Sequence, residues 1–136
     1  MDSKLEFLMK RHGVHVRLDQ PIQRPAYLTK LPTHYELAVR AGLEGPELDE
    51  AVAFQLARLL LGQLERLDKD GDTKLAEWRQ AVFLAARMLV PDELAARADG
   101  DIARAVAPLA VEAVDATQLL GRDAPGPGLQ IARQRI

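Results

Sequence analysis

The stretch "LDKDGDTKLAEW", Leu67 to Trp78, decides the fold that this sequence predicts. Before it, residues 47–67 read "ELDEAVAFQLARLLLGQLERL", with Val52, Leu56, Leu59, Leu60 and Leu64 on one helical stripe. After it, a second helix is expected from about Thr73 to Val90, bounded by Pro91. The sequence therefore predicts two helices joined by an acidic loop.

The carboxylates of this loop are candidate metal ligands. Asp68, Asp70 and Asp72 alternate along the chain, Gly71 permits a sharp turn, and Glu77 could supply a fourth carboxylate. Calcium is a hard cation that takes six to eight oxygen ligands. These four residues are therefore the predicted metal site, with Ca²⁺ as the cofactor. The alternative is a solvated acidic turn in which Asp72 or Thr73 caps the next helix.

At these residues the chain resembles the EF-hand family of helix–loop–helix calcium sites. "LDKDGD" is similar to the opening of such a loop, and Glu77-Trp78 is similar to its closing glutamate and the aromatic that follows. The resemblance implies that Asp68, Asp70 and Asp72 occupy the first, third and fifth ligand positions. Thr73 stands where the family has glycine, and Arg79 stands at the twelfth position. The resemblance thus implies weak calcium binding or none.

The Asp-Gly-Asp triplet of this loop recurs once. Asp99-Gly100-Asp101 follows 29 residues after Asp70-Gly71-Asp72, again between two expected helices. The resemblance then covers about residues 46–120, with the second unit a degenerate structural partner of the first. The predicted fold class is mainly α, a helical bundle with two EF-hand-like helix–loop–helix units.

The first 45 residues predict a different, mixed segment. A short helix over 3–12 ends at Gly13, and "VHVRL", residues 14–18, alternates like a half-buried strand. The proline-rich residues 20–32 indicate an extended arm or a loose hairpin. Thr33 and Glu36 stand at capping-box spacing, which predicts a short helix that Gly42 ends.

The chain is expected to form one globular domain with three segments: an N-terminal segment (1–45), a helical core (46–122) and a Pro/Gly linker with a tail (123–136). The tail "LQIARQRI" is either frayed or a docking peptide. Its candidate partner-binding residues are Leu129, Ile131, Arg133, Arg135 and Ile136.

Composition argues against an enzyme. The chain has no cysteine, and Ser3 is its only serine, so a serine or cysteine nucleophile is excluded. His12 and His15 have a metal-like spacing but no third ligand nearby in sequence. His34 and Glu36 could form an acid–base pair, but the capping box already accounts for Glu36.

Charge and hydropathy limit the classes of partner that the sequence predicts. Residues 1–40 carry 7 basic and 4 acidic groups, and residues 41–101 carry 7 basic and 13 acidic groups. The net charge of -2 predicts no nucleic-acid partner, and the absence of a long apolar run predicts no membrane span, so a cytoplasmic protein is expected. The functional hypothesis is a non-enzymatic protein–protein interaction or scaffold protein that binds a protein partner or forms a homo-oligomer.

An alternative functional hypothesis comes from residues 16–32. "VRLDQPIQRPAYLTKLP", followed by an expected helix, resembles the hairpin-then-helix start of phage tail assembly chaperones. This resemblance implies an assembly component or chaperone of a phage, prophage or other multi-subunit machine, independent of calcium.

Overall fold

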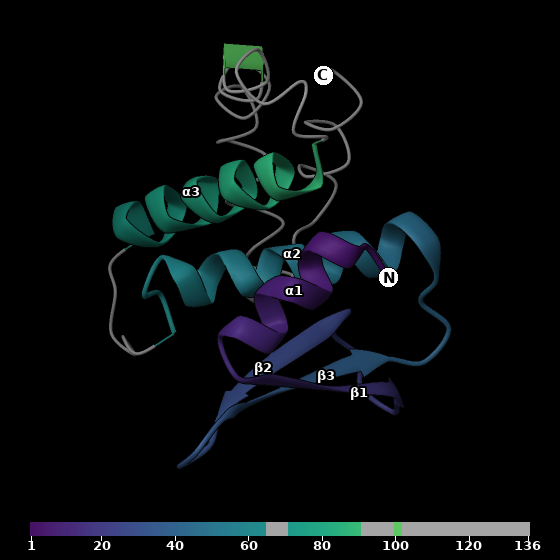
Figure 1. The fold of residues 1–136 in the computed structure, drawn as a ribbon. Coiled ribbons are helices and arrows are strands. Elements are labelled where there is room, and N and C mark those ends of the chain that lie inside the picture. The colour runs from purple at the N-terminus through teal and green to yellow at the C-terminus, as the bar shows by residue number, and fades with distance from the viewer. Residues whose placement is uncertain (65–70, 91–99, 102–136) are drawn as a thin grey trace.

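The computed structural model describes residues 1–64, 71–90 and 100–101. Within them the chain forms, in order, one helix, three strands and two further helices (Figure 1). Their bounds are α1 Ser3–Arg11, β1 Val14–Gln20, β2 Ala26–Lys30, β3 Tyr35–Arg40, α2 Gly45–Leu60 and α3 Gly71–Leu89.

The three strands form one mixed sheet with β3 in the centre. The strand order is β1-β3-β2, β1 is parallel to β3, and β2 is antiparallel to β3. Leu37 of β3 lies opposite Val16 of β1 and Leu28 of β2. The chain therefore passes from β1 to the far edge of the sheet and then returns through the middle.

The described helices lie on one side of the sheet (Figure 1). α1 contacts β1, α2 contacts β2 and β3, and α3 packs against α2. Residues Glu50 to Ala57 of α2 are all buried, because this helix has neighbours on several sides. The sheet contributes mainly Val14, Ala26, Leu28, Leu37 and Val39 to the core.

A glycine-based cap ends α2. The N–H of Gln63 donates to the carbonyl of Arg58 at 3.0 Å, and the N–H of Gly62 donates to that of Leu59 at 3.1 Å. This pair of bonds is a Schellman motif, and it needs the left-handed backbone of Gly62 (φ 68°). The buried Gln63 side chain then donates to the carbonyl of Glu77 in α3 at 2.9 Å. The end of α2 is thereby fixed to α3.

The predicted fold class is wrong. The chain is not a mainly helical bundle with two EF-hand-like units, because a three-stranded mixed sheet packs against the helices and makes the architecture α+β. α2 ends at Leu60, not at about Leu67, because the Gly62 cap stops it. The expected helices after Pro91 lie outside the described residues, apart from Asp101.

The short helix expected over residues 33–42 is also wrong, because this segment forms β3. Tyr35, Leu37 and Val39 alternate with polar or small residues, and the alternate side chains face the helices. Thr33 and Glu36 therefore cap no helix. Pairing with strands on both sides outweighs the local capping signal.

The arm or loose hairpin expected over residues 20–32 contains β2. Within the described residues this strand pairs only with β3, and β3 stands where the helix was expected, so the chaperone-like hairpin-then-helix arrangement is wrong as well. The N-terminal helix, the strand over "VHVRL" and the helix before Pro91 are confirmed as α1, β1 and α3. Within the described residues, no helix is long and apolar enough to cross a membrane.

Candidate interaction surface on the open face of the sheet

The predicted metal ligands are only partly within the described residues. Asp68 and Asp70 lie outside them, whereas the backbone of Asp72 and that of Glu77 are both part of α3. Positions five residues apart on a helix lie roughly 140° apart around its axis. Among the described residues, no group of three or more His, Asp or Glu side chains could hold a metal ion.

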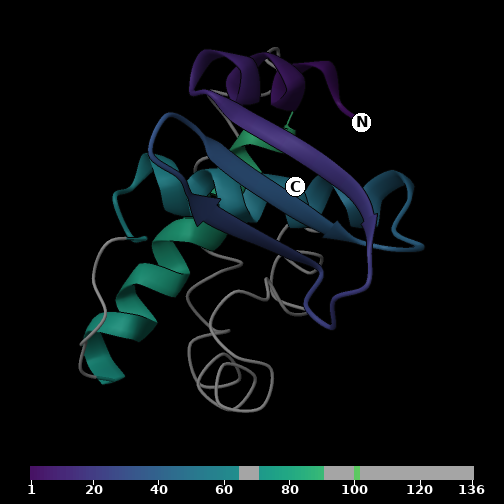
Figure 2. The same ribbon diagram turned by 90° about the horizontal axis from the view of Figure 1, so that it is seen from below.

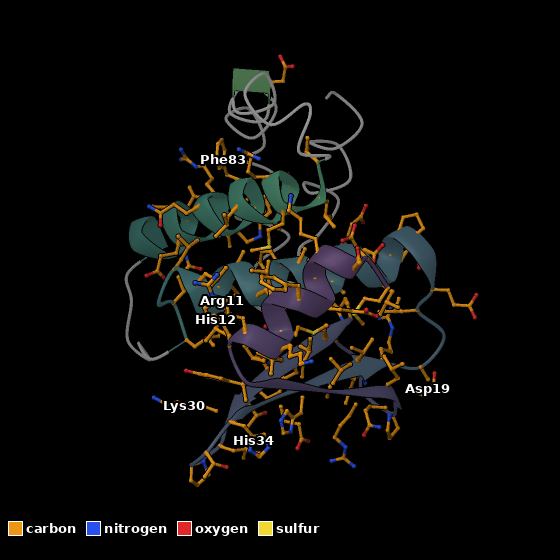
Figure 3. The ribbon with its side chains drawn as sticks, in the orientation of Figure 1. Arg11, His12, Asp19, Lys30, His34 and Phe83 are labelled. Atoms are coloured by element: carbon orange, nitrogen blue, oxygen red, sulfur yellow. The ribbon has the colours of Figure 1, made fainter. Side chains whose placement is uncertain are left out.

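The structure separates the two histidines of "HGVH" and gives His15 a different neighbour. His12 ends α1, where its N–H donates to the carbonyl of Leu8 at 3.1 Å. His15 lies on β1 and its ring stacks on that of His34, with ring centroids 4.3 Å apart. In Figure 3, His34 lies on the side of the sheet away from α1, and His12 lies at the end of α1.

The candidate tail residues Leu129, Ile131, Arg133, Arg135 and Ile136 lie outside the described residues, so their predicted role stays a prediction. Trp78 is buried in α3, as expected for a core residue at the exit of the acidic loop.

The face of the sheet turned away from α1, α2 and α3 is the most distinctive surface of the described chain. We call it the open face. Figure 2 shows this face, with the strands in front of α2. Because successive side chains of a strand alternate between faces, this side carries the residues between the core positions. They are His15, Arg17, Tyr27, Thr29, Glu36, Ala38 and Arg40, with His34 and Arg24 from the adjoining loops.

An ion pair joins two strands across this face. Nη1 of Arg17 on β1 donates to Oε1 of Glu36 on β3 at 3.0 Å. The arginine side chain is 60% exposed and that of the glutamate 31% exposed. Solvent screens such a pair, so it orients the Arg17 guanidinium more than it stabilises the fold.

The histidine pair lies beside this ion pair. His15 stands opposite Glu36 in the register of β1 and β3, and His34 is placed by the loop that precedes β3. The hydroxyl of Thr33 lies 3.0 Å from Nδ1 of His34. Two stacked imidazoles and one carboxylate therefore share the end of the sheet where β1 and β3 begin.

An exposed aromatic ring marks the β2 edge of the open face. Tyr27 is 44% exposed, and the guanidinium of Arg24 lies over its ring, 5.2 Å from the centroid. Opposite Tyr27 stands Ala38, and opposite Ala38 on the other side stands Arg17. The middle residue of this row, Ala38, has a much smaller side chain than Tyr27 and Arg17 on either side of it.

The open face is cationic although the whole chain is acidic. Arg17, Arg24 and Arg40 carry three positive charges and Glu36 carries one negative charge, a balance of +2 with neutral histidines. Nη1 of Arg40 donates to the carbonyl of Gln23 at 2.9 Å, which holds that side chain along the β1–β2 loop. Such a surface can bind carboxylates or other anions beside an aromatic ring.

Sequence reasoning missed this surface because it assigned residues 33–42 to a helix. The alternation of Tyr35, Leu37 and Val39 was the signal that could have found it, since it places Glu36, Ala38 and Arg40 together on the opposite face. The pairing of β3 between β1 and β2 has no comparable local signal.

Comparison with known proteins adds no family to this description. No protein-family model matches the chain, and neither curated proteins nor solved structures include a significant match.

Proposed function

We propose that this protein is a non-enzymatic interaction module that binds a protein partner through the open face of its sheet. The observation that carries the proposal is the exposed Tyr27–Arg24 pair, with Tyr27 in one cross-strand row with Ala38 and Arg17. Tyrosine and arginine are the residue types that most often dominate the binding energy of protein interfaces. A tyrosine ring adds contact area at low entropic cost, and the arginines supply directed charge.

The chemistry of the open face favours binding over catalysis. Its imidazoles stack on each other, and its only strand carboxylate is engaged by Arg17. The chain supplies no cysteine and only Ser3 as a serine, and Ser3 begins α1 on the helical side of the sheet. The stacked imidazoles and the Arg17–Glu36 pair suit a binding surface whose side chains are already held in place in the free protein.

Site-specific photo-crosslinking tests the proposal. A photoreactive phenylalanine analogue would replace Tyr27 in one variant and Phe7 in a control variant, since Phe7 is 61% exposed on α1. In cells that make the protein, we expect a discrete protein adduct from position 27 and none of the same mass from position 7. The partner, identified by mass spectrometry and purified, should bind Tyr27→Ser at least about tenfold more weakly, which corresponds to about 1.4 kcal/mol.

Two results would overturn the proposal. One is an adduct that forms equally from positions 7 and 27. The other is a purified partner whose affinity is unchanged by both Tyr27→Ser and Arg17→Ala, provided that circular dichroism shows both variants folded.

A further inference from the structure

The outer edge of β1 presents unused backbone hydrogen-bonding groups. The N–H of Tyr35 donates to the carbonyl of Gly13 at 2.9 Å, which places the peptide groups of residues 13, 15 and 17 toward β3. In a parallel pair, alternate residues point their N–H and C=O to opposite sides of the strand. Val14 and Val16 therefore direct theirs away from the sheet. Within the described part of the chain, no backbone group bonds to them.

This open edge has a defined end. The β1–β3 register shifts between Arg17 and Gln20, and Asp19 has a positive φ of 56°. The side chain of Gln20 donates to the carbonyl of Leu18 at 2.8 Å. The bulge interrupts the regular register, which resumes only at Gln20 opposite Arg40, so the edge offers residues 14–17 as its regular pairing segment.

A pocket of about 300 Å³ lies against this segment. Glu6, Met9 and Lys10 line it from α1, and residues 13–16 line it from β1. In Figure 2, α1 lies beyond β1 on the side away from β3. The pocket therefore adjoins the position that a fourth strand would occupy, and Met9, Val14 and Val16 give it apolar walls.

Two basic side chains lie on the other side of the same edge. His15 and Arg17 are on the open face of β1, and the Arg17 side chain, although paired with Glu36, is 60% exposed and can also meet an acidic side chain of a partner. A fourth strand would project alternate side chains to the two sides of the sheet. One set would enter the pocket beside α1, and the other set would lie next to His15 and Arg17.

We propose that β1 accepts, as a fourth strand, an extended peptide of a partner protein in which aliphatic and acidic residues alternate. Main-chain bonds to Val14 and Val16 supply the pairing, the pocket takes the aliphatic side chains, and Arg17 with His15 faces the acidic ones. This site goes beyond the proposed use of the open face and does not need Tyr27.

The test uses the full chain and a synthetic, end-blocked heptapeptide that alternates glutamate and valine. Titration followed by amide NMR should shift the resonances of Val14 and Val16 and slow their hydrogen exchange at low-millimolar peptide. Val16→Pro removes the outward N–H and should weaken binding at least about tenfold. Lys30→Pro is the matched control, because Lys30 directs its N–H away from β3 at the opposite edge of the sheet, and it should leave the affinity within about twofold.

A charge exchange keeps the test decisive if Val16→Pro fails to fold. Arg17→Glu should weaken the glutamate peptide and strengthen a peptide that alternates lysine and valine. Absence of binding, or binding that neither Val16→Pro nor Arg17→Glu alters, would overturn the strand-addition proposal. Tyr27→Ser should leave peptide binding unchanged, so failure here is separate from failure of the proposed function of the open face.

Discussion

Gly62 determines where α2 ends. Its backbone has φ 68°, a left-handed conformation that lets residues 62 and 63 bond back to Leu59 and Arg58. A Cβ at this position would meet no atom within 4 Å, so the cost of adding one is conformational and not a clash. A substitution of Gly62 therefore measures the backbone preference of glycine alone, without a change in packing.

We expect Gly62→Ala to lower the free energy of unfolding by about 1–2 kcal/mol, because L-residues with a Cβ disfavour this conformation by that amount. Urea denaturation monitored by circular dichroism measures the loss. Gly62→Asn is the control and should lose less, since asparagine tolerates left-handed backbone better. Equal losses for both variants would show that the cap has another cause.

The ion pair between Arg17 and Glu36 lies on the surface and contributes little to the free energy of unfolding. Its atoms are 3.0 Å apart, but the arginine is mostly exposed. A double-mutant cycle with Arg17→Ala and Glu36→Ala should give a coupling energy below about 1 kcal/mol that decreases as salt is added. A coupling of about 3 kcal/mol, unchanged by salt, would mean that this pair is buried in solution by a second molecule.

At the scale of elements, β3 is the central strand and holds the two edge strands together. It pairs with β1 on one side and β2 on the other, and its Leu37 is fully buried under the helices. Strands at both edges have only one neighbour each in the described chain. The stability of the sheet should therefore depend most on β3.

We expect Leu37→Ala to destabilise the protein by about 2–5 kcal/mol, because it deletes a buried side chain and leaves a cavity in the core. Leu18→Ala on β1 is the matched control, since Leu18 is 51% exposed, and it should change stability by no more than about 0.5 kcal/mol. Thermal or urea unfolding of both variants measures the difference. Similar losses at the two positions would contradict the assignment of β3 as the central strand.

At the scale of the whole molecule, the calcium hypothesis can be tested directly. Asp72 and Glu77 are both part of α3, and Arg79 stands at the twelfth position from Asp68. We therefore expect calorimetry on metal-stripped protein to detect no calcium site tighter than about 1 mM. The double variant Asp68→Ala, Asp70→Ala should give the same trace. A site tighter than about 100 µM that this variant abolishes would restore the EF-hand-like reading of the loop.

The mass of the protein in solution distinguishes binding to a different protein, as proposed here, from self-association. A module that binds a different protein should be a monomer of 15.0 kDa by light scattering at all concentrations. An assembly component that associates with itself should show a mass that rises with concentration. Calcium should change neither result.

Several elements could be predicted from local signals. α1, β1 and α3 follow from the 3.6-residue or two-residue spacing of their apolar positions and from Gly13 and Pro91 as boundaries. β3 was misread because Thr33 and Glu36 form a capping signal within a segment that also alternates. Local preferences of this size are small, and long-range pairing overrides them.

The sequence by itself determined the chemistry that the chain can use: its lack of cysteine, its single serine, its acidic middle and its basic first 40 residues. It also determined the places of α1, α2 and α3 within the described residues, because helical hydrogen bonds and apolar stripes are local. Only the tertiary structure decided that β3 inserts between β1 and β2, since bonds between strands join residues far apart in the chain. That insertion brings Arg17, Tyr27 and Glu36 onto one face and leaves the outer edge of β1 open.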